Sequence, residues 1–113
     1  MKMLDTLYDV TKRVTEEKSD HIIMQELQKI LIEALKCFHR FNAKAGRKEA
    51  LMEAIEHVDD AKVILRLCVD MKLVTYEDFK VYEEKLQGLV RMMVAEKNIV
   101  FGSKKAVAER SLG

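Results

Sequence analysis

The sequence contains no proline, and its 113 residues include only four glycines and no tryptophan. Proline and glycine most strongly interrupt helices and shape tight turns, so their scarcity disfavours a fold built on many short strands and hairpins. A chain of this length is typical of one domain. The composition therefore predicts a single all-α domain.

Cysteine is also scarce, and Cys37 and Cys68 stand alone rather than in a closely spaced pair. The first residues do not form the apolar stretch of a signal peptide, and no window is apolar enough for a membrane span. We therefore expect two reduced, buried thiols in a cytoplasmic protein without a membrane partner.

Motifs that carry chemistry are missing as well. The sequence has no glycine-rich phosphate loop, nucleophile elbow or metal-finger spacing. None of His21, His39 and His57 follows a glutamate by three residues, as a di-iron site in a helical bundle requires. We expect no metal, no cofactor and no enzymatic activity. A helical enzyme that works with scattered Arg, Lys and Glu, as chorismate mutases do, leaves no such motif and stays open as an alternative.

Apolar residues recur at helical spacing in four segments, from about residue 3 to 17, 20 to 45, 48 to 72 and 75 to 97. Short turns join them, so we expect an antiparallel up-and-down four-helix bundle over residues 1–98. Residues 99–113 are expected to form a flexible or short helical tail. The residues expected to face the core are Leu4, Leu7, Tyr8 and Val14; Ile23, Leu27, Ile30, Leu31, Ala34, Phe38 and Phe41; Leu51, Ala54, Ile55, Val58, Ala61, Leu65, Cys68 and Val69; and Phe79, Tyr82, Leu86, Leu89, Val90 and Met93.

The clearest boundary signal precedes the fourth segment. Thr75 is placed to cap the free amides there, and Asp78 occupies the capping-box position. Val74 and Phe79 have the spacing of a hydrophobic staple. Weaker signals mark the start and the end of the second segment, namely Ser19 or Asp20 and then Gly46.

Further apolar residues occur on the sides of the third and fourth segments that face away from the predicted core. One of these positions is a glycine, which allows another backbone to come close. We interpret the set as a surface for self-association, while apolar residues scattered over an ordinary surface are the simpler alternative. The set consists of Val63, Ile64, Leu67, Met71, Val81, Gly88 and Met92.

Basic residues share a narrow arc of the second segment and gather at the turn that follows it. Alone, such an arc is typical of a solvated face. Repeated around an oligomer, it becomes a multivalent surface for a polyanion although the formal net charge of one chain is only +1. The candidates for binding nucleic acid or a partner are Lys29, Lys36, Arg40, Lys44, Arg47 and Lys48.

Lys62 and Arg66 lie within and beside the apolar stripe of the third segment, with Asp59 and Asp70 in reach at helical spacings. In the simpler interpretation their stems cover the core while their heads reach water or those acids. The alternative is a role at a subunit contact or a nucleic-acid surface, so both residues remain candidates.

The stretch from residue 54 to 93 combines a basic, leucine-rich helix, a corner, and a tyrosine-containing helix that ends in an Arg-Met run. Its pieces are Leu65, Arg66 and Leu67; Asp70, Leu73, Val74 and Thr75; Tyr82; and Arg91, Met92 and Met93. In this pattern the chain resembles the four-helix-bundle family that includes the accessory variability determinant proteins of diversity-generating retroelements and the proteins encoded in intervening sequences of large-subunit rRNA genes. That family often has Gly-Gly-Trp where this chain has Val94, Ala95 and Glu96, so we expect the end of the fourth helix to pack differently.

The basic turn around Gly46 favours the retroelement branch of this family. The resemblance then implies a non-catalytic homopentamer, a ring of bundles whose positive surface binds the reverse transcriptase and structured RNA or an RNA/DNA hybrid. The intervening-sequence branch implies the same architecture in an oligomer with a structural or protein-interaction role.

Overall fold

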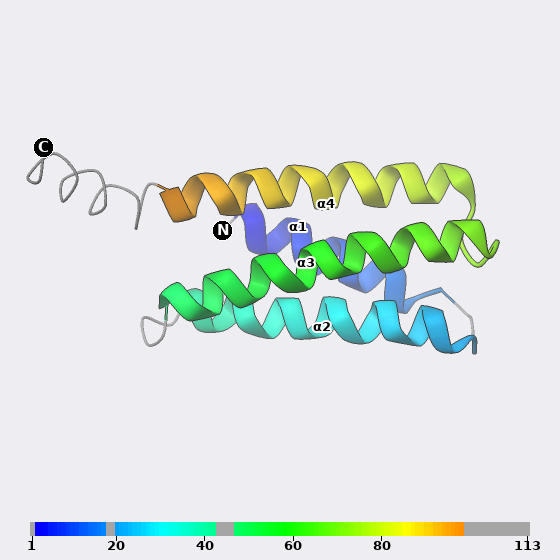
Figure 1. The fold of residues 1–113 in the computed structure, drawn as a ribbon, viewed down its shortest axis with the longest axis horizontal. Helices are drawn as coiled ribbons and strands as arrows, with labels where there is room; N and C mark the ends of the chain where they lie inside the picture. The colour runs from blue at the N-terminus through cyan, green and yellow to red at the C-terminus, as the bar shows by residue number, and fades with distance from the viewer. Residues whose placement is uncertain (1, 18–19, 43–46, 99–113) are drawn as a thin grey trace, which may run out of the picture.

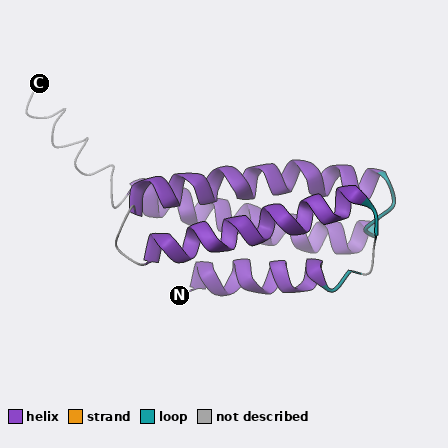
Figure 2. Cartoon of the chain, turned by 90° about the horizontal axis from the view of Figure 1, so that it is seen from below, coloured by secondary structure: helices purple, strands orange, loops and turns teal. Residues whose placement is uncertain are grey.

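The computed structural model describes residues 2–17, 20–42 and 47–98. These ranges contain four helices, α1 (Lys2–Thr15), α2 (Ile22–Asn42), α3 (Arg47–Asp70) and α4 (Tyr76–Lys97), and no strand. The helices run alternately up and down (Figures 1 and 2). α1 packs against α2 and α4, and α3 packs against the same two helices. The predicted all-α four-helix architecture is confirmed for the described residues, and the predicted tail lies outside them.

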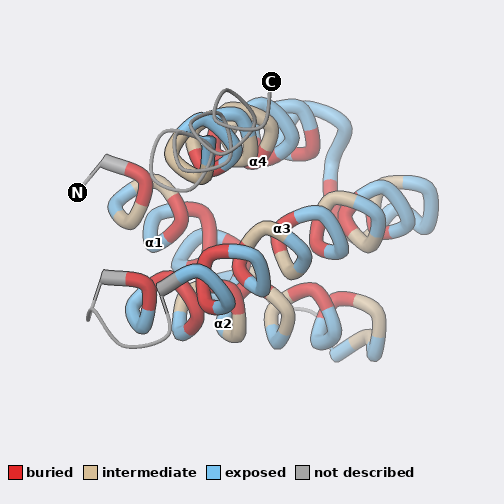
Figure 3. Tube along the Cα trace, turned by 60° about the vertical axis from the view of Figure 1, so that its left-hand side comes forward, coloured by how far each residue is buried: buried red, intermediate tan, exposed pale blue. Residues whose placement is uncertain are grey.

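Each helix contributes one buried stripe to a common core, so the buried stretches turn toward one another and the exposed ones turn outward (Figure 3). Phe38 and Phe41 pack against each other in this core, with ring centroids 5.6 Å apart in an edge-to-face arrangement. Of the predicted core residues, six are only partly buried and pack against its margin. They are Leu4, Ile23, Ile30, Ile55, Val69 and Val90.

One prediction for the core was wrong. Tyr8 is 59% exposed, whereas its neighbour Leu7 is fully buried. Successive residues of a helix are about 100° apart, so the strip of α1 that its neighbours cover includes Leu7 and excludes Tyr8. The core instead takes up Met24 and Val10, which the sequence analysis had not assigned to it. Cys37 and Cys68 are both buried and free, as predicted.

The start of α2 differs from the sequence-based expectation. The helix begins at Ile22, and the Nδ1 atom of His21 accepts a hydrogen bond from the N–H of Ile23 at 3.1 Å. An imidazole, rather than the side chain of Asp20, therefore satisfies a free amide at this end. Ser19 and Gly46, the other predicted boundary residues, lie outside the described residues.

The corner between α3 and α4 confirms the predicted cap. Thr75 has extended backbone angles, and its hydroxyl accepts a hydrogen bond from the N–H of Asp78 at 3.1 Å. The carboxylate of Asp78 forms no reciprocal bond with the N–H of Thr75, so the capping box is only half made. Val74 and Phe79 are both buried in the core cluster, as a staple requires.

α3 ends in a Schellman motif, although no glycine occupies the position after the helix. The N–H of Leu73 donates to the carbonyl of Cys68 at 2.9 Å, and the N–H of Lys72 donates to the carbonyl of Val69 at 3.0 Å. This pattern requires a left-handed residue after the helix, and Lys72 supplies it with a φ of 62°. A β-carbon makes that conformation unfavourable, so the corner contains local strain.

Polar contacts fix α1 against the other helices. The hydroxyl of Tyr82 donates to Glu17 at 3.2 Å, and the ammonium of Lys85 pairs with Asp9 at 2.8 Å. The hydrogen bond from Lys85 holds the pKa of Asp9 below its usual value. On the other side of α1, the side-chain amide of Gln28 donates to the carbonyl of Val14 at 3.1 Å. These contacts join α1 to both α2 and α4.

Replacing Lys72 with glycine should stabilise the protein by about 0.5–1 kcal/mol. The gain is smaller than the roughly 1–2 kcal/mol cost of the left-handed conformation because glycine also adds entropy to the unfolded chain. Urea denaturation of Lys72→Gly and Lys72→Ala measures it, since alanine removes the same charge but keeps the β-carbon. Equal stability of the two variants would show that the backbone at residue 72 is unstrained.

Tyr82 should titrate at unusually high pH. Burial, followed by the charge and hydrogen bond of Glu17, raises its pKa to about 12. An unfolded tyrosine titrates near 10, so the folded state keeps its proton longer, and stability should fall as the pH rises from about 10 to 12. The difference in tyrosinate absorbance between the wild type and Tyr82→Phe isolates this group. Glu17→Gln should shift its titration downward, and a step near pH 10 in the difference between the wild type and Tyr82→Phe would refute the assignment.

Candidate functional site

The basic arc predicted on the second helix lies on the surface of α2. Lys29, Lys36 and Arg40 are all exposed. Lys36 forms an ion pair with Glu33 at 3.3 Å, in which both side chains are largely solvated. Exposed ion pairs of this kind are weak, and another anion readily replaces the carboxylate, so Lys36 can still contact a phosphate. Lys29 has no ion-pair partner among the described residues.

Arg40 takes part in a contact between α2 and α3 that the sequence analysis did not foresee. Its guanidinium donates to Glu53 at 3.0 Å and to the sulfur of Cys37 at 2.9 Å. The thiol of Cys37 lies 3.6 Å from the same carboxylate. Burial raises the pKa of this thiol, and Arg40 opposes the shift. Arg40 therefore joins two helices and is less available to an external anion than Lys29.

The turn that the sequence analysis singled out is described only at its edges. Lys44 lies outside the described residues. Arg47 begins α3, and its side chain is outside the description, while Lys48 is exposed. The predicted clustering of positive charge at this turn therefore stays a prediction, supported on the described side by Lys48 alone.

Lys62 and Arg66 behave differently from each other. The ammonium of Lys62 donates to the side-chain oxygen of Gln87, which joins α3 to α4. The simpler interpretation had its head in water or paired with an acid of the same helix, and the structure gives it a partner on α4 instead. Arg66 is exposed and lies 3.9 Å from Asp70 one helical turn away, as expected.

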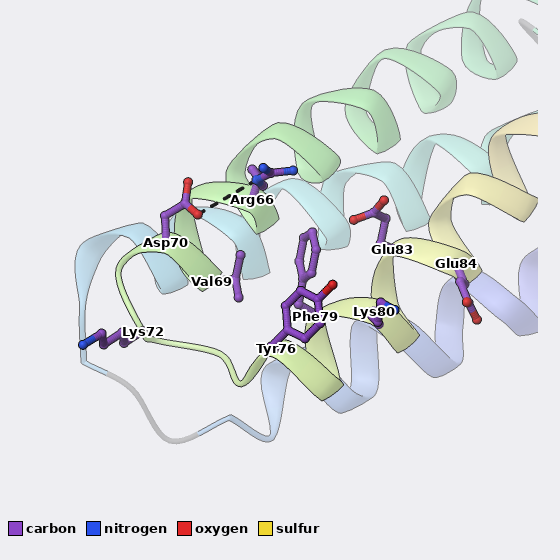
Figure 4. A pocket seen from close by; sticks show the side chains of 9 residues that line it. All are labelled: Arg66, Val69, Asp70, Lys72, Tyr76, Phe79, Lys80, Glu83 and Glu84. Atoms are coloured by element: carbon purple, nitrogen blue, oxygen red, sulfur yellow. Dashed lines mark ion pairs between the residues drawn. The ribbon is translucent and has the colours of Figure 1, made fainter.

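The corner of α3 and α4 opens into a groove with a volume of about 650 Å³. Phe79 and Val69 lie between the two helices, and Arg66 and Glu83 project above them from opposite sides (Figure 4). Arg66 and Glu83 form no ion pair with each other. A second hollow of about 330 Å³ continues along the helices, and its lining shares Arg66, Phe79 and Glu83. We call the two hollows together the α3/α4 groove.

Three residues of this groove escaped the sequence analysis. Tyr76 is exposed at its mouth, with the ammonium of Lys80 5.4 Å from its ring centre, and Glu83 faces Arg66. Their position depends on the register between α3 and α4, and the hydrogen bond between Lys62 and Gln87 is one contact that defines this register. Spacing along one helix carries no information on that register, so no sequence signal identified them.

The apolar residues predicted for self-association divide into two patches. The first, the α3 patch, consists of Val63, Leu67 and Met71, whose exposed fractions are 68%, 40% and 43%. They are four residues apart and therefore form one row along the helix. Ile64, predicted with them, is partly buried and packs against the core.

The second patch, the α4 patch, lies on a different side of the bundle. Val81 is exposed, Gly88 is partly exposed, and Met92 packs against the margin of the core. All three flank Lys85, whose partner Asp9 belongs to α1, so this patch lies at the edge of α4 nearest α1. Glu83 and Gln87 lie at the opposite edge, toward α3. The two patches therefore face different directions.

Several kinds of site are absent from the described residues. No group of three or more His, Cys, Asp or Glu side chains is arranged to hold a metal ion within residues 2–17, 20–42 and 47–98. None of the four described helices has an apolar stretch long enough to cross a bilayer. These findings leave the exposed basic arc, the α3/α4 groove and the two apolar patches as the candidate interaction surfaces.

The described residues form an all-helical four-helix bundle that carries the basic arc, the α3/α4 groove and the two apolar patches on its surface. Comparisons of the chain with protein-family models, curated proteins and solved structures found no match. The family resemblance described above therefore rests on the sequence pattern alone.

The contact between Arg40 and Glu53 predicts a measurable coupling between α2 and α3. We expect Arg40→Gln and Glu53→Gln each to lower the urea midpoint, and the double variant to lose less than the two single losses added together. This departure from additivity should become smaller in about 1 M salt, because both side chains are solvated and salt screens their charges. Strictly additive losses would mean that the two side chains do not interact in solution.

Proposed function

We propose that this protein is a non-catalytic binding protein that self-associates through α3 and α4 and presents the basic face of α2 to structured RNA. The observation that carries the proposal is the α3 patch, an exposed apolar row on the longest helix of the described chain. Single exposed apolar residues are ordinary, but a row of three on successive turns of one helix favours a contact surface.

Burial of this row on association would contribute usefully to stability. Complete burial of a Val, Leu or Met side chain contributes about 1.5–3 kcal/mol, and these three side chains are 40–68% exposed. Each therefore has roughly 1 kcal/mol left to gain. The loss of translational and rotational freedom on association offsets several kcal/mol, so neighbouring contacts on α4 have to contribute as well.

Association also explains how a nearly neutral chain can bind a polyanion. One chain carries a formal charge of +1, but Lys29 and Lys48 are exposed and belong to no described ion pair. Each additional copy repeats them at a fixed spacing. Several weak phosphate contacts then act together, which raises the overall affinity without any new type of contact.

The family resemblance supports a more specific form of the proposal. In that form the protein is the accessory protein of a diversity-generating retroelement, a homopentamer that binds reverse transcriptase and structured RNA or an RNA/DNA hybrid. The alternative is a protein of the rRNA intervening-sequence type, which would form a similar oligomer with a structural or protein-interaction role. Binding of RNA separates the two forms, since only the first requires it.

The test reverses charge at two matched pairs of positions. Lys29→Glu with Lys48→Glu should weaken binding to a structured RNA and flatten its dependence on salt. Each lost phosphate contact lowers the log-log slope by about 0.7–0.9. The control, Lys12→Glu with Arg13→Glu, changes the net charge equally at exposed positions of α1, outside the basic arc and the α3/α4 groove. Filter binding over a range of salt concentrations gives both slopes.

Two results would contradict the proposal. Equal weakening by both pairs would mean that only net charge matters and that the basic face of α2 has no special role. Wild-type protein that does not bind structured RNA at low salt would favour the structural alternative. Light scattering on the same samples should give the mass of several chains, and the mass of one chain, 13.1 kDa, would exclude self-association.

A further inference from the structure

His39 is an exposed residue in the last turn of α2, beside the basic arc. Lys36 precedes it by three residues, so the two side chains are neighbours on the helix surface. His39 forms no ion pair with another described residue. An imidazole is the side chain that gains a positive charge between about pH 8 and pH 5. Protonation of His39 would therefore add a charge to the arc.

The arc offers a polyanion only part of its positive charge. Lys36 and Arg40 are each paired with a glutamate. Among the described candidates on α2 and at the turn after it, Lys29 and Lys48 are exposed and have no ion-pair partner. One charge on His39 thus raises the number of unpaired positive groups on this surface from two to three.

The side of α2 that carries His39 faces α1. Gln28, which donates to the carbonyl of Val14 in α1, precedes His39 by eleven residues, which is about 20° around the helix. The two helices are antiparallel, so His39 lies level with the start of α1 (Figure 1). The described acid at that end of α1 is Asp5, which lines a hollow with Lys85 of α4 and so lies at the other edge of α1.

The acids of α3 lie on the opposite side of α2. The thiol of Cys37 is 3.6 Å from the carboxylate of Glu53, and Cys37 is about 160° around the helix from His39. Glu53 is also paired with Arg40, and Glu49 lies one helical turn before it on α3. The charged groups next to His39 on its own helix are therefore the cations of the arc.

We infer that protonation of His39 regulates the proposed RNA-binding surface, so that a structured RNA binds more tightly as the pH falls below neutral. The inference rests on the proposed function and adds a proton as a second ligand of the same surface. Repulsion from Lys36 and Arg40 disfavours the charged imidazole in the free protein, whereas RNA phosphates and the negative end of the α2 dipole favour it. RNA binding then promotes proton uptake, and by linkage proton uptake strengthens RNA binding by the same factor.

Filter binding of a structured RNA at about pH 8 and about pH 5.5, over a range of salt concentrations, tests this link. The affinity of the wild type should rise about two- to fivefold at the lower pH, the range expected of one exposed charged contact. The log-log slope of affinity against salt should steepen by up to about 0.7–0.9 for the added phosphate contact.

Three variants assign the effect to one side chain. His39→Gln should bind equally at both pH values, with the affinity of the wild type at the higher pH. His39→Lys carries the charge throughout and should bind at the higher pH as tightly as the wild type does at the lower one. His57→Gln is the control, since it removes a histidine of α3 outside the arc and should keep the wild-type response. Circular dichroism checks that every variant is folded at both pH values.

The remaining results separate this inference from the proposed function. If the wild type binds RNA with the same affinity at both pH values, the RNA-binding surface stands and its regulation by His39 is wrong. If His39→Gln keeps the wild-type response, or His57→Gln loses it, another group or the total charge is responsible, which also overturns the inference. If the wild type binds no RNA at either pH, the proposed function fails together with this inference.

Discussion

The architecture depends on one constraint, the burial of an apolar stripe from every helix in a core between four helices. α3 meets this constraint against α2 and α4 and still has a second apolar row on its outer side. The first half of that outer side is acidic, at Glu49, Glu56 and Asp60. Packing in the bundle therefore buries the apolar residues on one face of α3, and the apolar row on the C-terminal half of the other face stays exposed.

The corner between α3 and α4 places the candidate surfaces. The Schellman motif at Lys72 and the cap at Thr75 fix the direction in which α4 leaves α3. The contact of Lys62 with Gln87 then sets the register in which Arg66 and Glu83 face each other over Phe79. At the edge of α4 nearest α1, Lys85 pairs with Asp9 of α1. The α4 patch and the groove consequently lie on separate sides of the same helix.

Helical periodicity predicted the four helices to within a few residues, because each helix has a stripe of apolar residues wide enough to define its buried side. It also predicted the cap at Thr75, a signal confined to a few neighbouring residues. It failed where the outcome depends on another helix. The exposure of Tyr8 depends on which part of α1 the neighbouring helices cover. The partner of Lys62 depends on the register of α3 against α4, and the partner of Arg40 depends on how close Glu53 of α3 lies. Lys72 adopts a backbone conformation usually marked by glycine, so composition gave no indication of it.

The central claim is that a second copy covers the outer face of α3, and two methionines on this helix provide a direct test. Met71 belongs to the α3 patch and is 43% exposed in the protomer, whereas Met52 lies outside it and is 40% exposed. Brief oxidation with peroxide, followed by mass spectrometry of the peptides, compares their rates of sulfoxide formation. The account predicts that Met71 reacts several times more slowly than Met52 in the wild-type assembly. Equal rates at a concentration where the protein is assembled would show that the row faces water and would contradict the account.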